Sequence, residues 1–188
     1  MVRKTSLGFT LIELLIVIAV LGILAVAVLA AINPIEQINR SRDTGSRSDS
    51  EQLISAIDRF YASSGYYPWQ TGPTDTSNVD QGWLQVTASW ADGNALGVLA
   101  KMSQAGTEEI KSSFATRIVA TSYNPLFVYN AGVAGSSTYM CFLAKSSSFQ
   151  TESGVRCTEG LPDDLQDVSA TVCPAGCAAT KTCYSCLP

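Results

Sequence analysis

The longest apolar stretch of the chain lies near its amino terminus. From Leu14 to Ile32 no residue is charged, and from Phe9 onward Glu13 is the only ionisable group in the stretch. About 20 apolar helical residues are enough to cross a hydrocarbon layer of about 30 Å. The pattern therefore predicts a helix over residues 9–33 that is long enough to span a membrane.

A second helical pattern follows this stretch. Pro34 lacks an amide hydrogen, which predicts a kink or a loosened segment at residues 30–34. Apolar residues then recur at helical intervals, namely Leu53, Ile54, Ile57, Phe60 and Tyr61. Gly65 and Pro68 stand at the usual offsets for a helix end. We expect an amphipathic second half of one long helix over residues 34–68, packed on a globular head.

The polar stretch 39–52 carries charges of both signs within this second half. Mixed charges of this kind usually mark a solvated helix face. Salt bridges between subunits are the alternative interpretation.

The remaining residues, 69–188, predict a head of mixed secondary structure. Small and polar residues interleaved with three tryptophans predict a connecting loop over 69–95, and short helices could follow at 95–105 and 108–115. Strand patterns at 126–129 and 139–143, joined by a loop with Gly and Ser, predict an antiparallel hairpin. A third strand could come from 118–120 or 155–157. The predicted fold class is α+β, with one long amino-terminal helix packed on a small antiparallel sheet.

Composition narrows the class of protein. Apolar residues make up 46% of the chain and charged residues 15%, and the apolar excess is gathered in the one long stretch near the amino terminus, so a plain soluble domain is excluded. The net charge of -4 argues against a broad nucleic-acid surface. The chain has no His, which excludes His-based triads and His metal sites. No phosphate loop or nucleophile elbow is present, so we expect no enzymatic activity and no direct nucleic-acid partner.

The amino terminus allows three interpretations. Arg3 and Lys4 precede the apolar stretch, and basic residues there hold that end in the cytoplasm and send the rest outward. The stretch could be a plain anchor, or a secretory signal cut near Ala25-Val26-Ala27. The third interpretation depends on Glu13, because a carboxylate inside an apolar helix costs about 2.5–3.5 kcal/mol on insertion and so suggests a functional partner.

Residues 8–18 read GFTLIELLIVI and resemble the processing signal of type IV pilins and of type II secretion pseudopilins. The resemblance implies that a prepilin peptidase removes leader 1–8, cutting after Gly8 and methylating Phe9. It assigns Glu13, with the new amino terminus at Phe9, to subunit docking. The segment Gly65-Tyr66-Tyr67-Pro68 resembles an element that follows the long helix in this family.

The resemblance also implies a function and a location. We expect a structural subunit of a type IV pilus-like filament serving adhesion, motility or DNA uptake, or alternatively a pseudopilin that drives protein export. Expected partners are copies of the chain in a helical filament, the prepilin peptidase, an inner-membrane assembly platform and membrane lipid. The precursor would cross the bacterial inner membrane once, with its amino terminus inside, before joining an extracellular pilus or a periplasmic pseudopilus.

Cleavage would change the charges that govern assembly. It removes two of the twelve basic side chains and none of the sixteen acidic ones, so the side-chain balance goes from -4 to -6. It also creates an amino cation at Phe9, and the Glu13 carboxylate of a neighbouring subunit is its natural partner in a low-dielectric setting. Such a pair would fix the axial register between subunits.

Six cysteines follow the apolar stretch: Cys141, Cys157, Cys173, Cys177, Cys183 and Cys186. An even number facing an oxidising exterior favours disulfides. Our prediction pairs Cys141 with Cys157 and places two bridges among the last four cysteines. A four-thiolate zinc site from those last four is the rival interpretation, and a redox Cys-x-x-Cys is a weaker one.

Two further features of the head suggest weaker hypotheses. Asp163, Asp164 and Asp167 form an acidic cluster that could bind calcium, although their spacing matches no ligand pattern. No metal or cofactor is therefore assigned. The tryptophans and tyrosines could form an adhesive surface, but core packing is the preferred interpretation.

Overall fold

The computed structural model describes residues 8–76, 79–91, 97–133 and 135–188. It divides the chain into two units, Met1–Gln37 and Ile38–Pro188. Arg3, Lys4 and the rest of the predicted leader before Gly8 lie outside the described residues. So do residues 92–96, where the predicted loop 69–95 meets the predicted helix 95–105.

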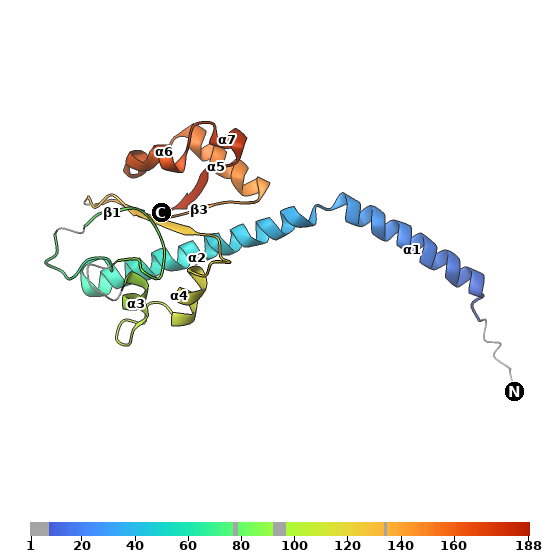
Figure 1. Ribbon diagram of the computed structural model, residues 1–188, viewed down its shortest axis with the longest axis horizontal. Coiled ribbons are helices and arrows are strands. Elements are labelled where there is room, and N and C mark those ends of the chain that lie inside the picture. Colours follow the sequence, from blue (N-terminus) through green and yellow to red (C-terminus); the bar gives the residue numbers. More distant parts are fainter. Residues whose placement is uncertain (1–7, 77–78, 92–96, 134) are drawn as a thin grey trace. The chain divides into compact units, whose positions relative to one another are not determined.

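The long helix consists of two helices, α1 (Leu11–Ala31) and α2 (Pro34–Ser64), as Figure 1 shows. Ile32 and Asn33 lie between them, and Ile32 has an extended backbone with ψ at 127°. Pro34 occupies the first position of α2, where its missing amide hydrogen costs nothing. The Asn33 side chain accepts a hydrogen bond of 3.3 Å from the Glu36 amide and so caps α2. The break falls inside the segment 30–34 where the sequence predicts a kink.

Helix α2 packs on the head along one stripe of its surface. The apolar part of the stripe is as predicted, with Leu53, Ile54, Ile57 and Phe60 buried, whereas Tyr61 is exposed. The helix ends at Ser64, and Gly65 follows with φ at 79°, a conformation that favours glycine.

The same stripe continues into the polar stretch 39–52. The prediction of a solvated face holds for exposed residues such as Arg40, Arg42 and Glu51, but not for the residues on the stripe. Asp43, Ser46, Asp49 and Ser50 are buried. Asp43 and Ser50 lie ahead of Leu53 at helical intervals on the same face. These polar residues are the part of α2 on which the later segments of the head dock.

Four antiparallel strands form one sheet in chain order: β1 (Gln81–Gln85), β2 (Leu126–Asn130), β3 (Thr138–Leu143) and β4 (Tyr184–Leu187). The predicted hairpin is β2–β3, with Val128 opposite Met140. Both proposals for a third strand are wrong, because 155–157 lies in a helix and 118–120 ends one. The third and fourth strands are β1, inside the predicted loop, and β4.

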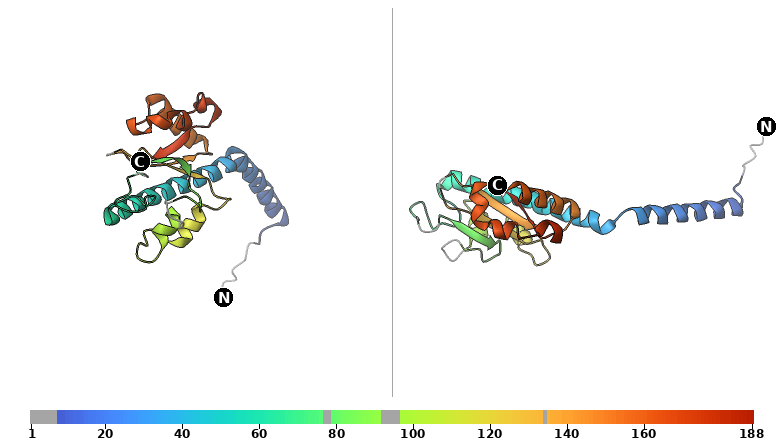
Figure 2. Two further views of the ribbon diagram at one scale, coloured as in Figure 1. Left: turned by 60° about the vertical axis from the view of Figure 1, so that its left-hand side comes forward. Right: turned by 90° about the horizontal axis from the view of Figure 1, so that it is seen from above.

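The two faces of the sheet bury different partners. Alternate side chains of β2 and β3, such as Val128 and Met140, join α2 in one core. The intervening side chains, such as Tyr129 and Tyr139, pack under the C-terminal region in a second core. Figure 2 shows the helices of the C-terminal region, in orange and red, on one side of the sheet and α2 on the other. The α+β architecture is therefore confirmed.

Short helices complete both sides of the head. On the α2 side lie α3 (Val98–Ser103) and α4 (Ser112–Ile118). The C-terminal side contains α5 (Ser147–Glu159), the 3-10 helix η1 (Asp163–Val168), α6 (Ser169–Val172) and α7 (Cys177–Thr180). The sequence pattern did not predict α5.

The tryptophans divide between the two cores. Trp69 and Trp90 are buried on the α2 side, in agreement with core packing. Trp83 is half-buried on the opposite face, where its ring stacks on Phe127 and meets the edge of Tyr184.

Candidate functional site

The peptide bond between Gly8 and Phe9 lies in an exposed, non-helical segment. Phe9 is 87% exposed, and α1 starts only at Leu11. A Cβ atom added to Gly8 would meet open space, and its backbone is not in the left-handed region. The fold of the chain therefore does not require glycine at this position, and the bond is accessible to a peptidase.

Glu13 and Thr10 cap the start of α1 reciprocally. The Oε2 atom of Glu13 accepts hydrogen bonds from the Thr10 amide at 2.8 Å and from the Thr10 hydroxyl at 2.7 Å. The Thr10 hydroxyl in turn accepts one from the Glu13 amide at 3.3 Å. This capping box satisfies amides that have no partner inside the helix. Within the described residues Oε1 of Glu13 makes no hydrogen bond, so half of the carboxylate remains available to another group.

Helix α1 exposes apolar side chains around its whole circumference. Residues Leu11–Ala30 form one helix that is long and apolar enough to cross a membrane, and none of it is buried. Side chains such as Leu15, Ile16 and Ile18 are each more than half exposed. A helix that is apolar on all sides needs a membrane or a protein interior around it.

All six cysteines form disulfides: Cys141–Cys186, Cys157–Cys173 and Cys177–Cys183. The predicted pair of Cys141 with Cys157 is wrong. Strand β4 places Cys186 directly opposite Cys141 in the ladder, whereas Cys157 lies in α5. Only one bridge joins two of the last four cysteines, because Cys173 and Cys186 pair with partners earlier in the chain.

Two of these bridges lie next to each other. The sulfur atoms of Cys157, Cys177 and Cys183 are within 4.8 Å of one another, and in the described part of the chain this is the group of potential metal ligands that the geometry brings together. The zinc hypothesis named Cys186 in place of Cys157, and Cys186 is bonded to Cys141.

The acidic cluster named for calcium is partly engaged by the head itself. Asp164 accepts hydrogen bonds from the Ser137 amide at 2.9 Å and from the Tyr139 hydroxyl at 2.7 Å. Burial raises the pKa of Asp164, but these bonds lower it more, so the pKa lies below its usual value. Burial and the bond to Asp164 raise the pKa of Tyr139 to about 12. Calcium binding stays a prediction.

An ion pair joins the buried Asp49 of α2 to the exposed Arg117 of α4. Arg117 donates two hydrogen bonds to the Asp49 carboxylate, at 2.7 and 2.8 Å, and Tyr123 donates a third. The bond to Asp49 raises the pKa of Arg117, and burial together with Asp49 raises the pKa of Tyr123. Paired in this way, the carboxylate is stable inside the head.

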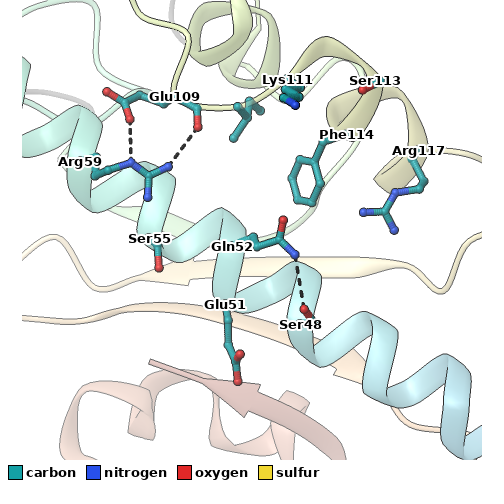
Figure 3. A pocket seen from close by; sticks show the side chains of 11 residues that line it. Ser48, Glu51, Gln52, Ser55, Arg59, Glu109, Lys111, Ser113, Phe114 and Arg117 are labelled. Carbon is teal, nitrogen blue, oxygen red and sulfur yellow. Dashed lines mark hydrogen bonds and ion pairs between the residues drawn. The ribbon is translucent and has the colours of Figure 1, made fainter.

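A groove of about 800 Å³ lies beside this pair, between α2 and the segment that contains α4. Figure 3 shows Arg59 at one end, donating to the side chain of Glu109 at 2.9 Å and to its backbone carbonyl at 3.0 Å. Arg117 lines the groove and is paired with Asp49, while Lys111 adds a further cation. Most of the charges that line the groove are neutralised locally.

Sequence reasoning missed Asp43, which fixes the C-terminal half of the head to α2. Its carboxylate is fully buried and accepts hydrogen bonds from the backbone amides of Lys145, at 3.0 Å, and Ser146, at 2.7 Å. Ser146 is the N-cap residue of α5, so Asp43 lies at the positive end of that helix. The sequence did contain a signal for the burial of Asp43, because Asp43 lies at a helical interval from Leu53 and so shares its buried face.

These features define a precursor that a membrane can anchor: an exposed apolar helix with one carboxylate near its start, attached to a disulfide-bonded α+β head. Residues 3–29 match the family model described as the prokaryotic N-terminal methylation motif, the signature of type IV pilins and pseudopilins. The motif indicates a pilin-like structural subunit rather than an enzyme. Searches of curated proteins and of solved structures found no match.

Proposed function

We propose that this chain is the precursor of a structural subunit of a type IV pilus-like filament. It is held in the membrane by α1 and assembles with copies of itself after its leader is removed. The observation that carries the proposal is α1 itself, whose apolar side chains are exposed on all sides while its first turn holds a single carboxylate. A filament core made of identical helices is an apolar environment like the bilayer, so transfer between the two costs little.

Processing prepares the subunit for assembly. A prepilin peptidase cuts the exposed bond after Gly8, which removes Arg3 and Lys4 and leaves an amino cation on Phe9. The inner-membrane assembly platform then moves the subunit out of the lipid. The enzyme has to recognise the segment in an extended form, and the non-helical backbone of residues 8–10 supports this step.

Glu13 sets the position of each arriving subunit. Its Oε2 atom is held by Thr10, which orients the carboxylate, while Oε1 is available to the amino cation of a neighbour. Both charges are costly alone in an apolar environment, and pairing relieves both. The pair acts mainly on register, because only one axial offset brings the two groups together.

The three disulfides support a pilus exposed outside the cell, where such bridges persist and filaments meet mechanical load. In that setting the filament serves adhesion, motility or DNA uptake. A pseudopilin of a type II secretion system is the second candidate. Pseudopilins have the same N-terminal methylation motif as pilins, and the segment Gly65–Pro68 resembles the element that follows the long helix in this family. Electron microscopy of the sheared surface fraction separates the two: abundant thin filaments support the pilus, and their absence together with a secretion defect supports the pseudopilin.

The substitution Glu13→Leu tests the proposal. We expect the variant to insert and to lose its leader normally, as mass spectrometry of the mature chain would show, but to form no filaments. The matched control is Glu36→Leu, which removes the same charge from the first turn of α2 and should leave filaments intact. Normal filaments in cells that carry only the Glu13→Leu chain would contradict the proposal.

A further inference from the structure

A pocket of about 270 Å³ lies where the start of the head meets two loops. One wall is the early part of α2, and the others are the loop that leads into β2 and the residues that follow β3. Its lining residues are Ser41, Arg42, Gly45, Ser46, Ser122, Tyr123, Asn124 and Lys145. None of these lining residues is acidic.

Two cations face this pocket without partners of their own. Arg42 and Lys145 are exposed, and in the described part of the chain neither side chain makes a hydrogen bond or an ion pair. The nearest carboxylates are already engaged. Asp43 is buried beneath and holds the backbone amides of Lys145 and Ser146, and Asp49 is paired with Arg117. Two cations against one buried carboxylate leave the pocket positive, although the chain as a whole carries -4.

The pocket also contains an unsatisfied donor. The hydroxyl of Ser46 is buried, with the residue only 1% exposed; it makes no hydrogen bond of normal length and angle, and its contact with the Tyr123 hydroxyl is a weak one. Buried polar groups are almost always paired, so an unpaired one calls for an explanation. The amide of Asn124 is committed to the Leu143 carbonyl at 3.0 Å, and the Tyr123 hydroxyl to Asp49. A ligand oxygen between the two cations would give the Ser46 hydroxyl an acceptor.

We propose that this pocket binds a phosphate group. Arg42 and Lys145 supply the counter-charges, the planar guanidinium of Arg42 matching two phosphate oxygens, and Ser46 donates a hydrogen bond from below. The three groups come from two segments, α2 and the residues that follow β3.

Phosphate has two sources, free inorganic phosphate and the headgroup of an anionic phospholipid. The lipid source, unlike the site itself, rests on the proposed storage of the chain in a membrane. Arg42 stands in the first turns of α2, soon after the chain leaves the apolar helix. A headgroup bound there would be released when the subunit leaves the membrane.

The test uses the full-length chain in maltoside micelles and isothermal titration calorimetry. One arm titrates inorganic phosphate, and the other titrates dihexanoyl-phosphatidylglycerol against phosphate-free dihexanoylglycerol. We expect a dissociation constant of about 1 mM or tighter for at least one phosphate ligand and none for the diacylglycerol. Binding in both arms assigns a general phosphate site, and binding of the lipid alone assigns a headgroup site.

Variants separate this pocket from general charge attraction. Arg42→Gln and Lys145→Gln should each weaken binding about tenfold, since each removes a charge-assisted contact. Arg40→Gln, an exposed cation on the same helix outside the pocket lining, should leave it unchanged. Ser46→Ala should weaken binding and change the melting temperature little, because the hydroxyl makes only a weak contact with Tyr123. Absence of binding in both arms, or equal weakening by Arg40→Gln, would overturn the proposal.

Discussion

Replacement of Asp43 should show that the C-terminal part of the head depends on one buried carboxylate. The side chain has no exposed surface and accepts hydrogen bonds from two backbone amides, those of Lys145 and Ser146. It also lies at the positive end of α5, a helix of 13 residues. In Asp43→Ala both amides lose their acceptor, and no other group of α2 is placed to replace it.

The expected loss follows from these contacts. Leaving one buried donor unsatisfied costs about 1–3 kcal/mol, and losing a carboxylate at a helix start costs about 0.3–1 kcal/mol more. Lys145 is an exposed residue, so its amide loses less than a fully buried one. We therefore expect Asp43→Ala to lower the free energy of unfolding by about 3 kcal/mol. A fall in melting temperature of about 6–12 °C corresponds to this loss for a domain of this size. Asp43→Asn keeps one acceptor oxygen and should lose about half as much.

The assay is urea denaturation of the full-length chain in micelles, followed by tryptophan fluorescence. Trp69 and Trp90 are buried in the head and report on its unfolding. The matched control is Asp58→Ala, which removes an exposed carboxylate from the same helix and should change stability by less than about 0.5 kcal/mol. A loss for Asp43→Ala no larger than that of the control would refute the reasoning.

Three further predictions concern the head. The low pKa of Asp164 stabilises the fold at neutral pH, and this contribution disappears as the pH falls through that pKa, so Asp164→Asn should lower the melting temperature at pH 7 but little under strongly acidic conditions. An equal fall in melting temperature at pH 7 and under strongly acidic conditions would contradict this prediction. Cys173→Ser frees Cys157 beside the Cys177–Cys183 bridge, and peptide mapping should find Cys157 bonded to one of that pair. The control is Cys186→Ser, which frees Cys141 instead of Cys157. An unchanged Cys177–Cys183 bridge in the Cys173→Ser variant would contradict the prediction. Lys181 has φ at 57°, so Lys181→Gly should stabilise the head by about 1 kcal/mol, whereas Lys111→Gly, where φ is -74°, should not; thermal unfolding compares the two.

The sequence predicted the elements whose signals are local. The apolar run specifies α1, Pro34 ends it, and Gly65 ends α2, because each effect acts within one or two helical turns. The hairpin of β2 and β3 likewise has alternating side chains and a short loop. The assembly segment from Gly8 to Glu13 could be found for the same reason, since its residues are neighbours in the chain.

The remaining elements depend on contacts between distant segments. Strand β1 contains Gly82 and two glutamines, and only its pairing with β2 makes it a strand. Helix α5 has a weak apolar pattern and is fixed by Asp43 at its start and by the ion pair of Arg47 with Glu152. Its formation removes Cys157 from any strand. No local pattern carries this information, so the disulfide pairing could not be deduced.

Strand β4 comes after all the other described elements in chain order, yet it completes the sheet by pairing with β3. In the proposed export of the chain, one edge of β3 therefore stays unpaired until residues 184–187 have been synthesised and translocated. Cys141 likewise lacks its partner Cys186 at that stage, and Cys157, which precedes Cys186 in the chain, is available to it earlier. On the proposed export of the chain, the sheet is completed only after residues 184–187 have crossed the membrane, and a premature Cys141–Cys157 bond would have to be exchanged before it closes.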